Sequence, residues 1–232
     1  MKNIFITGVN TGLGNALAVA YLSKGYKVYA VGREVPSILD KNPNFFFFTY
    51  DLSETYMLKE SLKDFIQKRT FEIAILNAGV LGDIKPLNQT NLMQIKEVME
   101  VNVWANKEII DALSEYAFVH QVVGISSGAS INGSKGWGAY SLSKSSLNML
   151  FNIYAKELPD IHFIALAPGV IDTDMVRHII HTIDERKYPS VTRLKEGKIQ
   201  SPKEAAHLLI ETFPKLYEYE SGSYLDVRTM ND

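Results

Sequence analysis

The chain has 232 residues, of which 46% are hydrophobic, and carries a formal net charge of -2 with no cysteine. This length predicts one domain with a sizeable core, and the lack of cysteine excludes disulfides and thiolate metal sites. No basic run suggests nucleic acid, and no run approaches the ~20 apolar residues that cross a bilayer. The opening residues, MKNIFITG, lead straight into a strand, so we expect no signal peptide and a cytoplasmic location.

Short apolar runs predict β-strands that alternate with longer helical patterns. We expect strands at 3–7, 27–32, 45–49, 73–76, 121–126, 162–167 and 223–227, and helices near 12–24, 54–69, 91–117, 138–158 and 201–212. This alternation is typical of a doubly wound parallel sheet with helices on both faces. We therefore predict a single Rossmann-type α/β domain over residues 1–232, with about seven strands. The segment 172–200 is too long for a plain connector and is expected to form a substrate lid.

A glycine-rich turn, ITGVNTGLG, joins the first strand to the first helix. Gly8, Gly12 and Gly14 would let the backbone turn sharply and approach a pyrophosphate, which the free N–H groups at the helix start attract. The spacing differs from the common G-x-G-x-x-G fingerprint, and glycine in such turns also serves geometry alone. The other residues of this turn that we expect at a nucleotide site are Asn10, Thr11 and Leu13.

Tyr140 and Lys144, in the stretch GWGAYSLSK, stand four residues apart in a predicted helix and share one face. A phenol has an ordinary pKa of about 10, which is too high for efficient proton transfer at neutral pH. A cation about 5 Å away would favour the phenolate by about 3 kcal/mol at an effective dielectric of about 20. The pair predicts a general acid and base, although chance alone would supply one Tyr-x-x-x-Lys match.

Five motifs in order resemble those of the short-chain dehydrogenase/reductase family. Thr7 and the glycine turn follow the family's T-G-x-x-x-G-x-G, and NAG (77–79), VN (101–102), ISS (125–127) and PGVIDT (168–173) come at later strand ends or in the next helix. Ser127 precedes Tyr140 by 13 residues, the usual separation in the family. The likeness covers nearly the whole chain. The short length of the chain and its segment VNVWANKEI are similar to those of the compact benzil- and sepiapterin-reductase-like members.

The resemblance implies an NADP(H)-dependent oxidoreductase that moves a hydride between a nicotinamide and a carbonyl or alcohol substrate. Tyr140 would be the acid or base, and Lys144 would also hold the ribose hydroxyls. Ser127 would bind the substrate oxygen, and Asn102 would position a water in a relay to Lys144. Ordinary structural roles are also open to such residues: Ser127 as a turn residue at a strand end, Asn102 as a buried polar side chain in a helix, and Thr173 as a helix cap. The further cofactor-binding residues implied are Asp51, Leu52, Asn77, Ala78, Gly79, Pro168, Gly169, Ile171 and Thr173.

The end of the second strand decides between NAD and NADP in this family. NAD-type members carry Asp where this chain has Gly32, and Arg33 follows. Because Gly32 has no carboxylate to repel a phosphate, the Arg33 guanidinium would pair with the 2′-phosphate of NADP. NADP is therefore favoured, and NAD remains possible. Glu34 follows at once, and Thr11 stands where many NADP enzymes have a second cation. Arg33 would otherwise be a solvated charge, and Asp51, near the adenine by resemblance, would also cap the next helix.

Other functions remain open at this stage. An NADP-binding redox-sensing regulator without turnover is the main alternative, although such proteins usually lack the tyrosine or the lysine. Enoyl reductases space this pair more widely, and extended epimerases are longer. His178 and His181 lack a third metal ligand, so we expect no metal. The lid arginines, Arg177, Arg186 and Arg193, would either favour an acidic substrate or be surface charges.

The substrate is a small carbonyl or alcohol whose identity the sequence does not specify. We expect its contacts from Ser130, Asn132, Trp137 and the lid, with Ile131 and Trp137 hinting at an apolar wall. The helix near 138–158 carries one apolar stripe to cover the sheet and a second that needs a partner, Leu142, Met149 and Ile153. The family builds subunit interfaces from this helix and the one near 95–113, which predicts a homodimer or homotetramer. No nucleic acid or membrane partner is expected.

Overall fold

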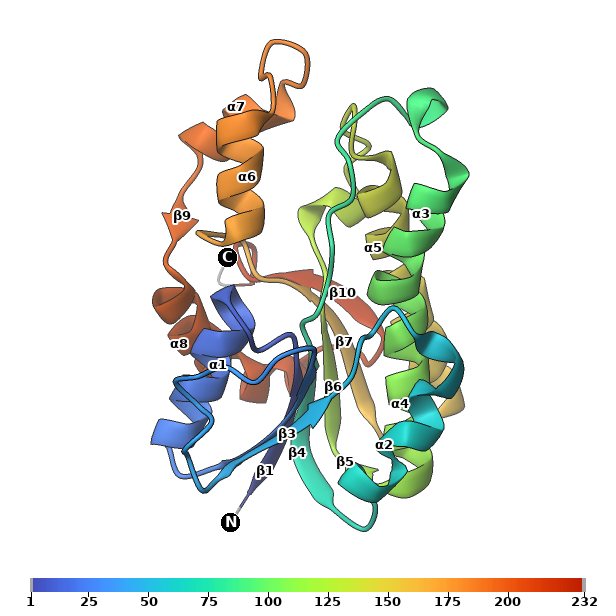
Figure 1. Cartoon of the computed structure of the whole chain (residues 1–232), viewed down its shortest axis with the longest axis vertical. Coiled ribbons are helices and arrows are strands. Elements are labelled where there is room, and N and C mark those ends of the chain that lie inside the picture. Colours follow the sequence, from blue (N-terminus) through green and yellow to red (C-terminus); the bar gives the residue numbers. More distant parts are fainter. Residues whose placement is uncertain (1, 231–232) are drawn as a thin grey trace.

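One parallel sheet organises the chain, in the order β3-β2-β1-β4-β6-β7-β10 (Figure 1). The structure is a computed structural model that describes residues 2–230, so residues 1 and 231–232 of the predicted domain lie outside it. The strands are β1 (Asn3–Thr7), β2 (Lys27–Gly32), β3 (Phe45–Thr49), β4 (Thr70–Leu76), β6 (Gln121–Ile125), β7 (His162–Ala167) and β10 (Ser223–Asp226). The two-residue strand β5 (Phe118–Val119) pairs with β4 and was not predicted. The doubly wound α/β fold is confirmed.

Helices cover both faces of this sheet. The helices α1 (Gly12–Ser23) and α8 (Pro202–Thr212) pack together on one face, and α2 (Leu58–Ile66), α4 (Ala105–Tyr116) and α5 (Gly138–Glu157) cover the other (Figure 1). Successive strand residues point to opposite faces, so Ile4 and Ile6 of β1 enter the α1/α8 core while Phe5 enters the α2/α4/α5 core. No helix within residues 2–230 is long and apolar enough to cross a membrane.

The predicted helix at 91–117 is present, but its hydrogen-bond pattern changes along its length. It begins as α3 (Leu92–Met99), passes through a π-helical turn, η3 (Glu100–Trp104), and continues as α4. Such turns interrupt the usual hydrogen-bond ladder and are frequent at functional sites. Short 3-10 turns complete the fold at η1 (Thr55–Met57), η2 (Leu87–Gln89), η4 (Gly128–Ser130) and η5 (Phe213–Glu218).

The predicted lid segment, 172–200, contains regular secondary structure. This segment contains α6 (Asp174–Thr182) and α7 (Ser190–Glu196), and the strands β8 (Val170–Ile171) and β9 (Ile199–Gln200) pair in parallel at its base. The Thr173 hydroxyl starts α6 by accepting a hydrogen bond from Val176 N at 3.4 Å. Figure 1 shows α6 and α7 extending beyond the sheet on the side of α1 and α8. The whole segment 172–200, which contains these two helices, is called the lid below.

The last helix begins as its sequence indicates. The Ser201 hydroxyl accepts a hydrogen bond from Glu204 N at 3.2 Å, and the Glu204 carboxylate accepts one from Ser201 N at 2.9 Å. This reciprocal capping box satisfies backbone donors that have no partner inside the helix, and Pro202 stands at the first helical position.

Candidate active site

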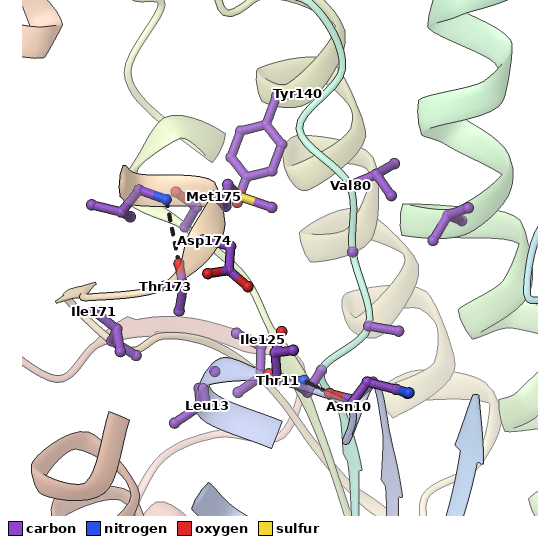
Figure 2. Close-up of a pocket in the computed structure, with 18 of the residues that line it drawn as sticks. Asn10, Thr11, Leu13, Val80, Ile125, Tyr140, Ile171, Thr173, Asp174 and Met175 are labelled. Carbon is purple, nitrogen blue, oxygen red and sulfur yellow. Dashed lines mark hydrogen bonds between the residues drawn. The ribbon is translucent and has the colours of Figure 1, made fainter. Parts of the chain in front are cut away.

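A cleft of about 860 Å³ lies at the carboxyl ends of the parallel strands. The strand order reverses between β1 and β4, and ligands of doubly wound sheets bind outside such a switch point. Figure 2 shows residues from distant segments converging here, with Asn10, Thr11 and Leu13 towards one end and Tyr140 towards the other. Every residue predicted to bind cofactor lines this cleft except Gly14, and of the predicted catalytic residues only Asn102 is set behind its wall.

The glycine turn brings backbone to the floor of the cleft. Gly8 and Gly12 have φ of +72° and +58°, which a side chain would strain. A Cβ on Gly14 would lie 2.1 Å from Gly8 O, so Gly14 permits the turn without lining the cleft. The Thr11 side chain makes no capping hydrogen bond to α1, and α1 has no acidic residue in its first turn. The first N–H groups of α1 therefore fit an anion.

Hydrogen bonds join the two loops on either side of the switch point. The Thr7 hydroxyl accepts from both Asn77 N and Ala78 N at 3.0 Å. The Asn77 side-chain amide donates to Thr7 O at 3.1 Å and to Gly8 O at 3.0 Å. The loop after β4 is thereby fixed against the glycine turn, which explains why NAG accompanies the glycine motif in this chain.

Lys144 and Tyr140 lie together at one end of the cleft. The Lys144 side chain is almost fully buried, and its Nζ donates to Ile125 O at 2.7 Å while lying 5.7 Å from the Tyr140 ring centroid. Burial lowers the pKa of Lys144 to about 8. Burial raises the pKa of Tyr140, and a hydrogen bond with Ser127 opposes that rise. The expected lowering of the Tyr140 pKa by a nearby cation is not found in the protein by itself, because burial removes water from the phenol and raises its pKa.

Asn102 occupies the π-helical turn η3 and is fully buried. Its Oδ1 accepts from Val80 N at 2.8 Å, and its Nδ2 donates to Val80 O and to Ser143 Oγ at 2.9 Å each. A Cβ on Gly79 would lie 3.2 Å from Asn102 Oδ1 and 3.4 Å from Lys144 Nζ. The side chain of Asn102 thus ties the loop after β4 to α5 directly behind Lys144, with Gly79 between them and the cleft.

The opposite end of the cleft carries Arg33 and Asp51. No carboxylate within residues 2–230 lies at salt-bridge distance from Arg33, although Glu34 also lines the cleft. Asp51 accepts from Ser53 N at 3.0 Å and from Ser53 Oγ at 2.9 Å, and these bonds lower the pKa of Asp51, with a smaller effect from Arg33. Asp51 therefore closes a local turn at the rim of the cleft and does not cap the next helix, because η1 and α2 follow Glu54 and Met57 and have no side-chain cap.

The substrate contacts predicted from sequence are only partly right. Trp137 lines the cleft, whereas Ser130, Asn132 and Ile131 do not. Ser130 is turned inward, where its hydroxyl accepts from the Asn148 amide at 2.9 Å. Asn132 donates to Gly128 O at 2.9 Å, within its own turn, and Ile131 is 68% exposed on the surface.

Sequence reasoning missed several apolar residues of the cleft. Outside the predicted lid these are Val80, Val101, Ile125 and Val170, and within it the sequence did not single out Met175, Val176, Ile179 and Leu194. None has a side chain whose chemistry marks it, and only the packing of the lid over the strand ends brings them together. The lid arginines do not line the cleft: Arg177 forms two hydrogen bonds with Asp172, at 2.7 and 2.9 Å, and Arg193 donates to Ser134. No group of three metal-ligating His, Cys, Asp or Glu side chains occurs in the described part of the chain.

Comparisons with known proteins place this arrangement in a family. The sequence pattern of the short chain dehydrogenases matches residues 2–184. The chain is 30% identical to a benzil reductase ((S)-benzoin forming) of Bacillus cereus, over 93% of this chain and 97% of that protein. It is 29% identical to sepiapterin reductase of Bos taurus, over 66% and 61% of the two chains. A short-chain dehydrogenase/reductase structure from Saccharomyces cerevisiae superimposes with a TM-score of 0.85 at 25% identity, covering 100% and 98% of the chains.

The chain belongs to the short-chain dehydrogenase/reductase family. The class of protein that the fold and cleft define is thus an NAD(P)-dependent oxidoreductase, and the named relatives make it carbonyl-reductase-like. The resemblance first drawn from five short motifs is confirmed.

Proposed function

We propose that this protein reduces a small-molecule carbonyl with NADPH and runs the reverse oxidation of the alcohol with NADP. One observation carries the proposal. The cleft that begins at the uncapped start of α1 and passes the free guanidinium of Arg33 ends at Tyr140, Lys144 and Ser127. A dinucleotide site and a proton donor therefore share one cavity.

The residues of the cleft fit the cofactor. The N–H groups at the start of α1 would hold the pyrophosphate, and Arg33 would pair with the 2′-phosphate. Asp51 and Leu52 would flank the adenine, and the loop from Asn77 to Gly79 would lie along the dinucleotide. Within residues 2–230, Ile125 O is the acceptor that Lys144 Nζ contacts, which leaves two of its three N–H donors for ribose hydroxyls. Residues Pro168, Gly169, Ile171 and Thr173 would orient the carboxamide.

The proton chemistry belongs to the protein. When bound, the nicotinamide supplies or accepts the hydride. The Ser127 hydroxyl would hydrogen-bond the carbonyl oxygen and polarise it, and Tyr140 would give its proton to that oxygen as the alcohol forms. Lys144 carries its charge at neutral pH because its pKa is about 8. That charge, together with the positive charge of the oxidised cofactor, would offset the effect of burial on the Tyr140 phenolate.

Asn102 has a positioning role in this proposal. Its side chain is fully engaged with Val80 and Ser143, so it would act through the shape of the π-helical turn and through a water near Lys144. Reprotonation of Tyr140 would pass through that water and Lys144.

The experiment measures NADPH and NADH oxidation with diketones, quinones, aldehydes and steroids. Loss of a general acid costs about 10² to 10⁴ in rate, so Tyr140→Phe should lose at least that lower factor in kcat while NADPH binding is retained. Tyr56→Phe is the matched control, since Tyr56 is 94% exposed and away from the cleft. No turnover by the wild type with any substrate, with NADPH still bound, would favour the redox-sensing regulator instead.

The cofactor preference has its own test. Removing a charge-assisted hydrogen bond costs about 1.5–3 kcal/mol, so Arg33→Ala should raise the KM for NADPH about 10- to 150-fold and leave that for NADH nearly unchanged. A wild-type preference for NADH would contradict the proposed role of Arg33.

We also propose a homodimer or homotetramer. The predicted inner stripe of α5, Leu147, Leu150, Phe151, Tyr154 and Leu158, packs on the sheet as expected. The outer stripe remains exposed, with Leu142, Met149 and Ile153 at 48%, 59% and 44%. Most apolar residues of the neighbouring 95–113 segment are instead buried within the chain, so the outer stripe of α5 is the stronger support for an interface. A cytoplasmic location stays a prediction.

A further inference from the structure

Trp137 lies where the cleft, the lid and the proposed proton donor meet. Its indole is 9% exposed and lines the cleft. The ring centroids of Trp137 and Tyr140 are 6.1 Å apart, in an edge-on arrangement with an interplanar angle of 62°. The indole Nε1 donates to Ser190 Oγ at 2.7 Å, and Ser190 is the first residue of α7 in the lid. One side chain thus connects the lid to the Tyr140 ring.

The surroundings of this hydrogen bond show that the lid is fitted to Trp137. Trp137, Ile179, Tyr188 and Val191 form a small buried cluster of their own, separate from the two cores of the sheet. Gly136 has φ of +88°, and a Cβ there would lie 2.6 Å from Tyr188 Cε1. The lid therefore packs directly on the backbone that carries Trp137, and this close approach requires a glycine.

The lid residues that line the cleft beside Trp137 are mostly apolar, with Asp174 as the charged exception. Trp137, Met175, Ile179 and Leu194 form this apolar wall. Figure 2 shows Met175 near Tyr140 at this end of the cleft. The cations of the lid are turned elsewhere, as the pairing of Arg177 with Asp172 shows. A carboxylate on this wall would have to lose water without a counter-charge from the lid, and it would share the cleft with the Asp174 carboxylate, whereas a flat apolar ring would lose little.

We propose that Trp137 is a specificity-determining residue, whose indole is the surface on which an aromatic carbonyl substrate packs, and that Ser190 is the positioning residue that fixes the indole. The choice of substrate class rests on the proposed reductase function. The positioning of the indole by Ser190 is independent of that function, because it follows from the hydrogen bond and the packing alone.

The kinetic test compares a pair of diketones, 1-phenyl-1,2-propanedione and 2,3-butanedione. A net hydrogen bond is worth about 2- to 12-fold, so Ser190→Ala should raise the KM for the phenyl substrate by that factor and leave its kcat nearly unchanged. The same variant should change kcat/KM for butanedione by less than about twofold, the lower end of that range. Trp137→Ala should raise the KM for the phenyl substrate still further, because the whole packing surface is lost.

Ser134→Ala is the matched control. It removes a different polar contact to the lid, in which Arg193 donates to Ser134 Oγ at 3.1 Å, and neither partner lines the cleft. Its KM values should equal those of the wild type. Equal effects of Ser190→Ala on both diketones, or no effect on either, would overturn the assignment of specificity to Trp137.

A second measurement needs no turnover. The chain has 2 tryptophans, so a Trp104→Phe background leaves Trp137 as the sole indole emitter. Acrylamide should quench Trp137 weakly in this background, more strongly after Ser190→Ala, and as weakly as before after Ser134→Ala. If no carbonyl is reduced but quenching follows this order, the proposed function fails while the Trp137–Ser190 contact stands. Unchanged quenching after Ser190→Ala would refute the positioning role whatever the activity.

Discussion

The buried ammonium of Lys144 should make the stability of the fold depend on pH above neutrality. Burial lowers the pKa of Lys144 from its ordinary value of 10.5 to about 8. Between these two values the unfolded chain holds a proton that the folded protein releases, so unfolding becomes less favourable as the pH rises. Fully charged, the buried lysine costs the fold about 3 kcal/mol relative to its neutral form, and that cost disappears above about pH 10.

Lys144→Met keeps the length of the side chain and removes the titrating group. From about pH 7 to about pH 9.5, integration over these pKa values gives the lysine protein a gain of about 2 kcal/mol over the methionine variant. The variant also loses the hydrogen bond to Ile125 O, but that loss is the same at every pH and cancels from the comparison. Both proteins should carry Tyr140→Phe, because a tyrosine in the unfolded chain begins to ionise near the upper end of this range.

The free energy of unfolding would be measured by urea denaturation, followed by far-UV circular dichroism at both pH values. Lys24→Met serves as the control, since Lys24 is exposed at the end of α1 and its removal should leave the pH dependence as in the parent. If the stability difference between the parent and the Lys144→Met variant changes by less than about 0.5 kcal/mol, the reasoning is refuted, because the ammonium would then be as well hydrated as in the unfolded chain.

Three further outcomes are expected. Gly14→Ala should lower the free energy of unfolding in urea by about 3 kcal/mol or more and abolish NADPH binding, because the new Cβ would lie 2.1 Å from Gly8 O. Gly133→Ala is the control: its Cβ would have no heavy atom within 4 Å, so neither stability nor NADPH binding should change. Ser201→Ala should lower the free energy of unfolding by about 1 kcal/mol through loss of the capping box, and an unchanged urea midpoint would contradict this. Met149→Glu should convert the oligomer to monomers, as measured by sedimentation velocity at micromolar concentration. A wild-type protein that is itself monomeric would contradict the proposed subunit interface.

The sheet was predictable because its strands are buried on both faces. Runs such as NIFIT and KVYAVG are apolar without alternation, and the helices between them require parallel crossovers. The two-residue strands β5, β8 and β9 were not predictable, since a strand that short has no periodicity to detect. The lid helices were missed for a related reason: α6 and α7 span 9 and 7 residues, and the apolar face of each is too short to stand out.

The site was predictable where chemistry restricts the residue type. Tyr140, Lys144, Gly8 and Gly12 had to be those residues, so spacing and order were sufficient to place them in one cleft. Their environment was not predictable, because the raised pKa of Tyr140 depends on how completely the surrounding walls exclude water. Ser130 was expected to face substrate, yet the turn after β6 points it inward to Asn148. No local pattern distinguishes those two orientations.

The short pairing of β8 with β9 makes the lid a module with its own closed base. Val170 and Ile171 lie beside Ile199 and Gln200, and Asp172 N donates to Gln200 O at 2.8 Å just inside that base. The pairing holds together the two ends of the 27-residue segment between β8 and β9, whatever the conformation of that segment. Changes in length or sequence there need not disturb the sheet, because closing a somewhat longer loop adds little entropy cost. A lid from another reductase could thus be transplanted at these two strands, which makes selectivity separable from hydride chemistry.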